Sequence, residues 1–306
     1  MTVLDPKVLR HLLAVMRTGS IRGAAEFLGL APSAVSRQIA DLEYRLGVSL
    51  LERTSRGVVI TEAGHLVAEH ARRTFEDQDV LTEQLGQLKE LRQGIVRICC
   101  DEGFVADLIE HGVAGFTEIY PAIRFQIDVA GTDRVLEAIT QGDTDIGVAY
   151  NPTIDTGVRP LAIQRQPLCM VTSPDHPLTA REAVGLRDVV DSPMALLTVG
   201  HGIRQLIGRA AADAGLTLAP TMETPSIDVL RRFAAAGLGV TFLPRFAVAA
   251  ELARGGVAVV ELTDAVLVEA SAHLMVRAGR RLPVSVERMA GYLAREMVAF
   301  HDVPMV

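Results

Sequence analysis

The chain has 306 residues, of which 49% are hydrophobic and 22% charged, a globular composition with room for two or three domains. The formal net charge of −7 argues against nucleic-acid binding by the chain as a whole, but the charge is unevenly spread. Residues 1–65 hold eight Lys and Arg against six Asp and Glu, so this segment carries a net +2 and the rest carries −9. A mildly basic head on an acidic body suits a head that contacts DNA and a body with another task.

We expect neither an export signal nor a membrane partner. Charged residues interrupt the first 20 positions, and no apolar run approaches the roughly 20 residues that cross a bilayer. The three cysteines, Cys99, Cys100 and Cys169, lie in apolar runs. This favours buried, reduced thiols in a cytoplasmic protein over a redox switch.

The first 60 residues predict a small helical domain that ends in a hairpin. Helices are expected at 6–17, 21–28 and 32–46, with Ser20 as the N-cap of the second and Pro32 at the first position of the third. Two short strands, at 50–53 and 58–60, would form a wing. A tight turn between the second and third helices is typical of the helix-turn-helix that reads the major groove of double-stranded DNA.

The polar outer face of helix 32–46 and the arginines of the wing supply the expected DNA contacts. Short polar and guanidinium groups reach base edges and phosphates, and phosphate contacts add affinity without sequence information. From periodicity alone, a helix pair that binds no nucleic acid is the alternative. The predicted DNA-binding residues are Ser20, Arg22, Pro32, Ser33, Ala34, Ser36, Arg37, Gln38, Arg53, Thr54 and Arg56.

A long linker helix is expected over 61–92, with Thr61 as its N-cap. Its apolar positions follow a rough heptad, mainly in the last third, which suits a seam with the same helix of a second copy. The alternative is a helix that packs only on its own domain. The predicted dimerisation residues are Val67, Leu81, Leu85 and Leu88.

From residue 93 onward strands and helices alternate, which predicts an α/β fold with parallel sheets covered on both faces. The last strand and helix, at 272–277 and 284–300, return to the first lobe. This gives one lobe of about 93–160 and 267–306 and another of about 161–266, joined by crossovers near 158–164 and 262–268. The expected strands are 95–100, 123–129, 145–149, 167–172, 193–198, 221–223, 239–243 and 272–277.

Two such lobes would face each other across a cleft, because ligands of open α/β sheets bind beyond the carboxyl ends of the strands. Residues 198–202 offer backbone N–H groups at a helix start, which suits a carboxylate. Asp101 and Glu102 would repel an anion, so either the ligand brings a donor or a cation to them, or they cap a helix. The predicted effector-binding residues are Asp101, Glu102, Thr132, Tyr150, Thr198, Gly200, His201, Gly202, Ser226 and Thr241.

The sequence contains no recognisable catalytic, cofactor or metal motif. Gly237 and Gly239 open a dinucleotide-like pattern, but Phe242 stands where the third glycine belongs. The cysteines lack metal-ligand spacing, and no nucleophile motif is present. We therefore expect no enzyme activity, no metal and no cofactor.

Motif residues over about 45 positions resemble the LysR-type transcriptional regulators in order and spacing. They include Gly19 and Ser20, AVSRQI at 34–39, LLER at 50–53 and TEAG at 61–64. The body resembles the effector-binding domain of the same family, which is itself similar to periplasmic binding proteins, through QGDTDI at 141–146 and AGLGV at 236–240. One departure is Ala31-Pro32-Ser33, where the family commonly has a polar triplet with a base-reading Gln, and Ser33 is the candidate replacement.

The resemblance implies a winged helix-turn-helix at 1–60, a linker helix at 61–92 and a two-lobed effector domain at 93–306. It also implies a homodimer that assembles into a homotetramer, a small-molecule metabolite in the cleft, and RNA polymerase as a further partner. The alternatives are a regulator that senses oxidation through Cys99 or Cys169 and a solute-binding α/β protein.

Overall fold

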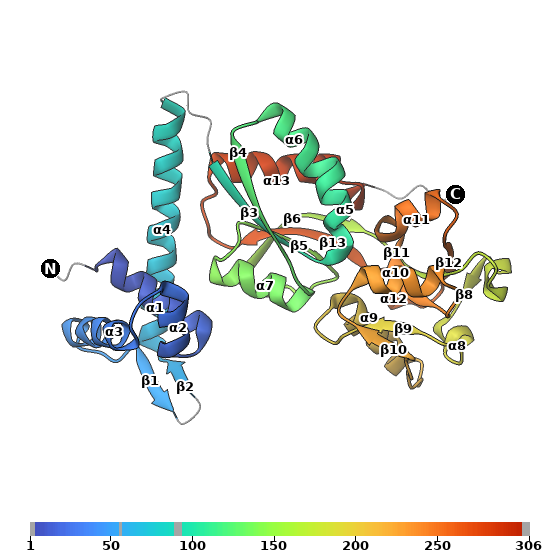
Figure 1. Ribbon diagram of the computed structural model, residues 1–306, viewed down its shortest axis with the longest axis horizontal. Helices are drawn as coiled ribbons and strands as arrows, with labels where there is room; N and C mark the ends of the chain where they lie inside the picture. The colour runs from blue at the N-terminus through green and yellow to red at the C-terminus, as the bar shows by residue number, and fades with distance from the viewer. Residues whose placement is uncertain (1–3, 55–56, 89–93, 302–306) are drawn as a thin grey trace. The chain divides into compact units, whose positions relative to one another are not determined.

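The computed structural model describes residues 4–54, 57–88 and 94–301, which belong to two compact units, residues 1–84 and 85–306. The first unit contains α1 (Pro6–Thr18), α2 (Ile21–Leu28), α3 (Pro32–Leu46), the hairpin β1 (Leu51–Thr54) and β2 (Gly57–Ile60), and most of α4 (Glu62–Leu88) (Figure 1). The predicted helix-turn-helix and wing are therefore confirmed.

Local signals in the sequence account for these boundaries. The N–H of Gly23 donates to Ser20 Oγ at 3.0 Å, so Ser20 caps α2 as predicted. Gly29 ends α2 with a φ of +66°, a left-handed conformation that glycine adopts without strain. The carboxylate of Glu43, in α3, accepts from the backbone N–H groups of Leu50 at 2.7 Å and Leu51 at 3.0 Å. This contact fixes the start of the hairpin to α3.

The linker helix α4 begins at its predicted cap, because the N–H of Gly64 donates to Thr61 Oγ1 at 3.0 Å. Its first turns pack on the domain that precedes them: Ala68 and Ala71 are fully buried, and Val67 packs against the core residues Leu12 and Leu42. Val67 therefore has apolar neighbours within its own domain, and its place in a dimer seam stays a prediction. An apolar residue in the first third of α4 has the helices of its own domain as neighbours.

The first sheet of the second unit contains β3 (Gly94–Cys100), β4 (Ile123–Val129), β5 (Ile146–Tyr150), β6 (Val158–Arg165) and β13 (Ser271–Arg277), in the order β4-β3-β5-β13-β6. α7 (Thr132–Gln141) covers one face and α13 (Val284–Glu296) the other (Figure 1). β3 pairs in parallel with β4 and β5, but β13 runs antiparallel to both of its neighbours. The expectation of a wholly parallel sheet is wrong.

The predicted first crossover, residues 158–164, lies in the edge strand β6 of the first sheet, which leads directly into β7 of the second lobe. β6 contains Pro160 and is largely exposed to solvent. An edge strand tolerates a proline and exposed side chains, and Pro160 lies where the register with β13 shifts.

Residues 102–119 form four consecutive helical segments. These are η1 (Glu102–Phe104), α5 (Val105–Asp107), the π-helical η2 (Leu108–Val113) and α6 (Ala114–Ile119). The buried carboxylate of Asp107 accepts from the N–H groups of Val298 at 2.9 Å and Ala299 at 2.8 Å. It thereby ties this region to η5 (Val298–Phe300).

The second lobe has a mixed sheet in the order β11-β7-β12-β8, and β9 pairs in parallel with β10. A parallel bridge from Met194 to Val240 links the two groups of strands. The strands are β7 (Leu168–Thr172), β8 (Ala183–Val184), β9 (Ala195–Leu197), β10 (Met222–Thr224), β11 (Thr241–Pro244) and β12 (Ala258–Leu262). The helices are η3 (Pro177–Ala180), α8 (Leu186–Val189), α9 (Gly202–Asp213), α10 (Ile227–Ala235), η4 (Arg245–Val248), α11 (Ala249–Ala253) and α12 (Ala265–Val268).

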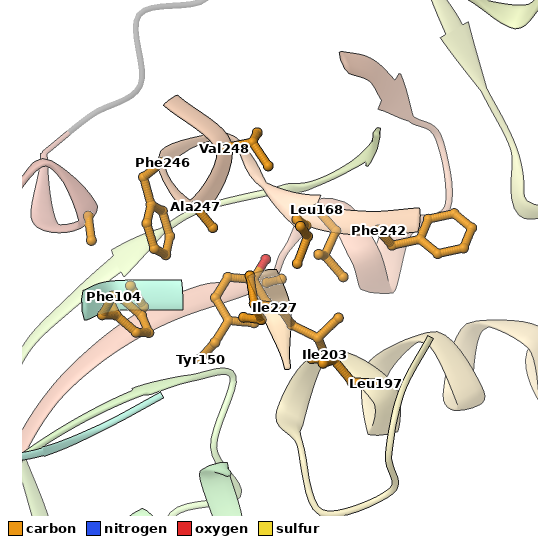
Figure 2. Packing of buried hydrophobic residues seen from close by; sticks show 14 of the residues in the cluster. Phe104, Tyr150, Leu168, Leu197, Ile203, Ile227, Phe242, Phe246, Ala247 and Val248 are labelled. Atoms are coloured by element: carbon orange, nitrogen blue, oxygen red, sulfur yellow. The ribbon is translucent and has the colours of Figure 1, made fainter. Parts of the chain in front are cut away.

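One hydrophobic core extends through both lobes. It includes Phe104 and Tyr150 from the first lobe and Ile203, Ile227 and Phe246 from the second. Figure 2 shows these side chains converging, and the rings of Phe104 and Phe246 lie 4.8 Å apart. The lobes therefore meet through apolar packing as well as polar contacts.

Candidate DNA-binding face and ligand cavity

The solvent-facing side of α3 carries three side chains suited to DNA, which we call the recognition face: Ser33, Arg37 and Tyr44. All three are exposed, and their positions fall on one side of a helix. Tyr44, whose exposed fraction is 88%, was missed by the sequence analysis. A large aromatic residue opposite the buried stripe Val35, Ile39 and Leu42 is the signal that would have found it.

Other predicted DNA-binding residues have different surroundings. Pro32 is exposed at the first turn of α3, whereas Ala34 and Ser36 are half-buried. Gln38 is half-buried, and its Oε1 is buried without a hydrogen-bond partner among the described residues. Arg22 is exposed and pairs with Glu26 at 3.3 Å.

The wing is described only in part. Thr54 is exposed, and its hydroxyl donates to the carbonyl oxygen of Gly57 at 3.2 Å. Arg56 and the side chain of Arg53 lie outside the described residues.

The far part of α4 exposes two large apolar side chains at the predicted seam. Leu81 is 55% exposed and Leu85 is 52% exposed. The side chain of Leu88 lies outside the described part. Two leucines four residues apart form a short apolar stripe along one side of this helix.

A small cavity lies between the lobes, at the carboxyl ends of β3, β5 and β9. It brings together five of the ten predicted effector-binding residues: Asp101, Thr132, Tyr150, His201 and Gly202. The volume open to the centre of a water molecule is about 10 Å³, enough for roughly one water. The other wall residues were not predicted from the sequence. They follow strand ends or begin helices and are mostly apolar: Gly103, Phe104, Leu197, Ile203, Ile227, Pro244, Phe246 and Ala247.

Asp101 is the buried polar group of this cavity. Its Oδ2 accepts from the N–H of Tyr150 at 2.7 Å and from the hydroxyl of Thr132 at 3.0 Å. Its Oδ1 is buried and has no hydrogen-bond partner among the described residues. Burial raises the pKa of this carboxyl to about 7, because the loss of hydration outweighs the two donated hydrogen bonds, which lower the pKa.

Glu102 does not line the cavity but caps a helix of the opposite lobe. Its carboxylate accepts from the Ser226 hydroxyl at 2.9 Å and from the N–H groups of Ile227 at 2.6 Å and Asp228 at 3.2 Å. Of the two roles considered for this acid, helix capping is the one that the structure contains. The Ser226 hydroxyl and the Glu102 carboxylate are therefore hydrogen-bonded to each other at the start of α10.

The remaining predicted effector residues also lie outside the cavity lining. The Thr241 hydroxyl donates to Ala195 O at 2.9 Å inside the sheet. Thr198 bonds through its N–H to Thr224 O at 3.1 Å, and Gly200 O accepts from Asp133 N at 3.4 Å. Thr241 and Thr198 thus form hydrogen bonds within the second lobe, and Gly200 forms a backbone hydrogen bond between the two lobes. None of the three residues lines the cavity.

The Tyr150 side chain forms part of the cavity wall without offering a free hydroxyl. The Tyr150 hydroxyl donates to Gln166 O at 2.5 Å. Its ring therefore supplies apolar surface, and its role as a polar ligand contact is not supported.

The three cysteines are buried, and none is in a disulfide. Burial raises the pKa of Cys99 to about 11, of Cys100 to about 12 and of Cys169 to about 11. Oxidation proceeds through the thiolate, so these thiols have poor reactivity. This opposes the redox alternative.

Within the described ranges, no group of three or more His, Cys, Asp or Glu is arranged to hold a metal ion. Among the helices that the structure describes, none is long and apolar enough to cross a membrane.

Two family models match the chain along most of its length. The model for the bacterial regulatory helix-turn-helix protein of the lysR family matches residues 6–65, and that for the LysR substrate binding domain matches residues 89–298. The uncharacterized HTH-type transcriptional regulator YfeR of Shigella flexneri is 30% identical over 283 residues, covering 92% of this chain and 91% of that protein. The DNA-binding transcriptional dual regulator OxyR of Escherichia coli is 29% identical over 249 residues, covering 81% and 82%.

A solved structure shares the fold at lower sequence identity. A full-length OxyR variant from Pseudomonas aeruginosa matches with a TM-score of 0.70 and 21% identity over 100% of both chains. At this identity the likeness concerns the fold alone.

Proposed function

The chain belongs to the LysR family of bacterial helix-turn-helix transcriptional regulators, which bind DNA and respond to a small-molecule effector, and we propose how its own residues perform these tasks. We assign DNA reading to residues 1–60, dimerisation to the helix at 61–92 and effector binding to residues 93–306. The proposal assigns no catalytic role to any residue, and DNA binding would place the protein in the cytoplasm.

Sequence reading is assigned to the recognition face of α3. The observation that carries this assignment is the exposure of Ser33, Arg37 and Tyr44 along one side of a helix whose other side is buried. Arg37 is suited to bidentate contact with a guanine or to a phosphate, and Ser33 and Tyr44 to base edges or backbone oxygens. Gln38 is left out of the base-reading set because it is half-buried, with its Oε1 turned away from solvent.

Two copies would pair through the exposed part of α4, where Leu81 and Leu85 provide an apolar stripe. A two-fold pair of recognition helices fits a partly palindromic site with half-sites about one helical turn apart, and a tetramer would contact two such sites. RNA polymerase is proposed as the protein partner through which bound regulator alters transcription.

The ligand is assigned to the interlobe cavity that contains Asp101, Thr132 and His201. A ligand can shift the assembly only if it binds one arrangement of the lobes more tightly than another. The cavity is small because the lobes are in contact, so a ligand larger than water requires them to separate. Ligand binding would therefore be coupled to lobe movement.

Replacing Arg37 with Ala tests the DNA-reading assignment. We expect binding to a fragment upstream of the protein's own gene to weaken about 5- to 150-fold, corresponding to about 1–3 kcal/mol for one guanine contact. If Arg37 contacts phosphate instead, the slope of log K against log salt falls by about one. Fluorescence anisotropy with wild type and Arg37→Ala at several salt concentrations measures both.

Arg124→Ala is the matched control, because Arg124 is an exposed arginine of the second unit, on β4. It removes the same charge and should leave affinity and salt slope unchanged. Equal affinity and equal slope for Arg37→Ala and wild type would remove Arg37 from the interface.

A further inference from the structure

Two helix N-termini of the second lobe are capped by side chains of the first lobe. At α9, the N–H of Gly202 donates to Thr132 Oγ1 at 2.8 Å. At α10, the N–H groups of Ile227 and Asp228 donate to the carboxylate of Glu102. Backbone N–H groups at helix starts are the groups that hold an anionic ligand in α/β clefts. Here the chain's own oxygen atoms occupy them.

The polar atom left open in the cavity is an acceptor. Asp101 is only 6% exposed, lines the cavity, and keeps Oδ1 without a partner among the described residues. A buried acceptor without a donor is unfavourable, so a ligand that supplies a donor there recovers free energy.

The rest of the lining offers little to an anion. Among the thirteen lining residues that the structure describes, none is Lys or Arg. His201 lines the cavity, but burial lowers its pKa, so it brings no full positive charge near neutral pH. At pH 7.5, where a carboxyl with a pKa of about 7 is mostly ionised, a ligand carboxylate would place a second negative group beside Asp101 in surroundings that screen charge poorly. An ammonium would be attracted there instead.

We propose that the ligand of this cavity is a small, largely apolar molecule with a hydrogen-bond donor, either an ammonium or a neutral N–H or O–H group, that donates to Asp101 Oδ1, and that carboxylates are rejected. The apolar part of the ligand would contact Phe104, Ile227 and Phe246, whose side chains converge at this point (Figure 2). This inference rests on the proposed function, because it names the chemical class of the effector for the same cleft.

The test compares ligands that share a skeleton and differ in one group. The full-length protein is titrated at pH 7.5 with benzylamine, benzyl alcohol and benzoate, and with the smaller isobutylamine, isobutanol and isobutyrate. The shift of Tm with concentration gives each Kd. In at least one set, the amine or the alcohol should bind at least tenfold more tightly than the carboxylate, the size expected for one hydrogen bond to a charged group.

Asp101→Asn should weaken binding of the preferred amine at least tenfold, because Asn keeps the oxygen that accepts from Tyr150 and Thr132 but removes the charge. Asp175→Asn is the control, since Asp175 lies exposed in a turn of the second lobe and loses the same charge. This variant should retain the ligand preference of wild type.

Three results would overturn the inference. If a carboxylate binds wild type as tightly as its amine and alcohol counterparts, the ligand class is wrong while an effector cleft is supported. If no compound of either set raises Tm, both the proposed ligand class and the assignment of the effector site to this cavity are wrong. If Asp101→Asn keeps the full amine preference, the donor is not held by Asp101. None of these results affects the DNA-binding experiment on Arg37. A failure of the ligand inference can therefore be distinguished from a failure of the DNA-reading assignment.

Discussion

Burial of Asp101 should make the stability of the effector domain fall as pH rises, and Asp101→Asn should remove this dependence. The pKa of this carboxyl is raised from 3.8 to about 7 in the folded chain by loss of hydration. Between these values the folded protein holds a proton that the unfolded chain has released. The favourable contribution is therefore complete below about pH 4 and is lost as pH rises through 7.

The magnitude follows from the same linkage. Each pH unit in this window costs up to about 1.4 kcal/mol of unfolding free energy, so wild type should lose about 3 kcal/mol between pH 5 and pH 8 from this group alone. Asp101→Asn lacks the titration. The difference in stability, variant minus wild type, should therefore rise by about 3 kcal/mol over that range, whatever fixed cost the amide brings.

Urea unfolding at pH 5, 6.5 and 8, at one protein concentration, measures this difference. Tyrosine fluorescence reports mainly on the relevant unit, because three of the four tyrosines, Tyr120, Tyr150 and Tyr292, lie within residues 85–306. Asp175→Asn, at an exposed turn, controls for the change in net charge and should track wild type at every pH. A constant difference between Asp101→Asn and wild type across the three pH values would refute the reasoning.

Three further predictions concern other parts of the chain. Glu43→Ala should destabilise residues 1–84 by about 1–3 kcal/mol in thermal unfolding, because the partly buried N–H groups of Leu50 and Leu51 lose their acceptor. Glu43→Gln should lose less, and equal losses would contradict that role. Leu81→Glu should weaken dimerisation at least tenfold in sedimentation, whereas Leu66→Glu, exposed on the same helix but off the predicted seam, should not; unchanged assembly in both would reject the seam. The native thiols should resist Ellman's reagent at pH 8 until urea unfolds the protein, and rapid native labelling would restore the redox alternative.

The N-terminal unit was predictable because its determinants are local. Ser20 caps the helix that starts one residue later, and Val35, Ile39 and Leu42 mark the buried side of α3 by spacing alone. Tyr44 could have been found in the same way, as the aromatic residue on the opposite side. The packing of Val67 against its own domain could not be predicted, because the sequence does not state which neighbour a helix face meets.

The body was predictable element by element but not in its pairing. β6 and β13 are hydrogen-bonded although more than a hundred residues separate them along the chain, and no local pattern specifies that the pair is antiparallel. The cleft shows the same limit. Strand ends identified Asp101 and Glu102 as neighbours in sequence, but Glu102 meets Ser226, 124 positions later, while Asp101 faces the cavity. Only the packing of the two lobes shows that Glu102 caps a helix and that Asp101 lines the cavity.

The position of β13 has a consequence for synthesis of the protein on the ribosome. β5 and β6 lie on either side of β13 and pair with it, so the first sheet stays incomplete until residues 271–277 have been made. All strands of the second lobe precede β13 in the chain and can form their sheet earlier. The helix-turn-helix is contiguous and is translated first. During translation the chain should therefore expose the unpaired edges of β5 and β6 while the second lobe is made, which is the interval in which it is most open to aggregation.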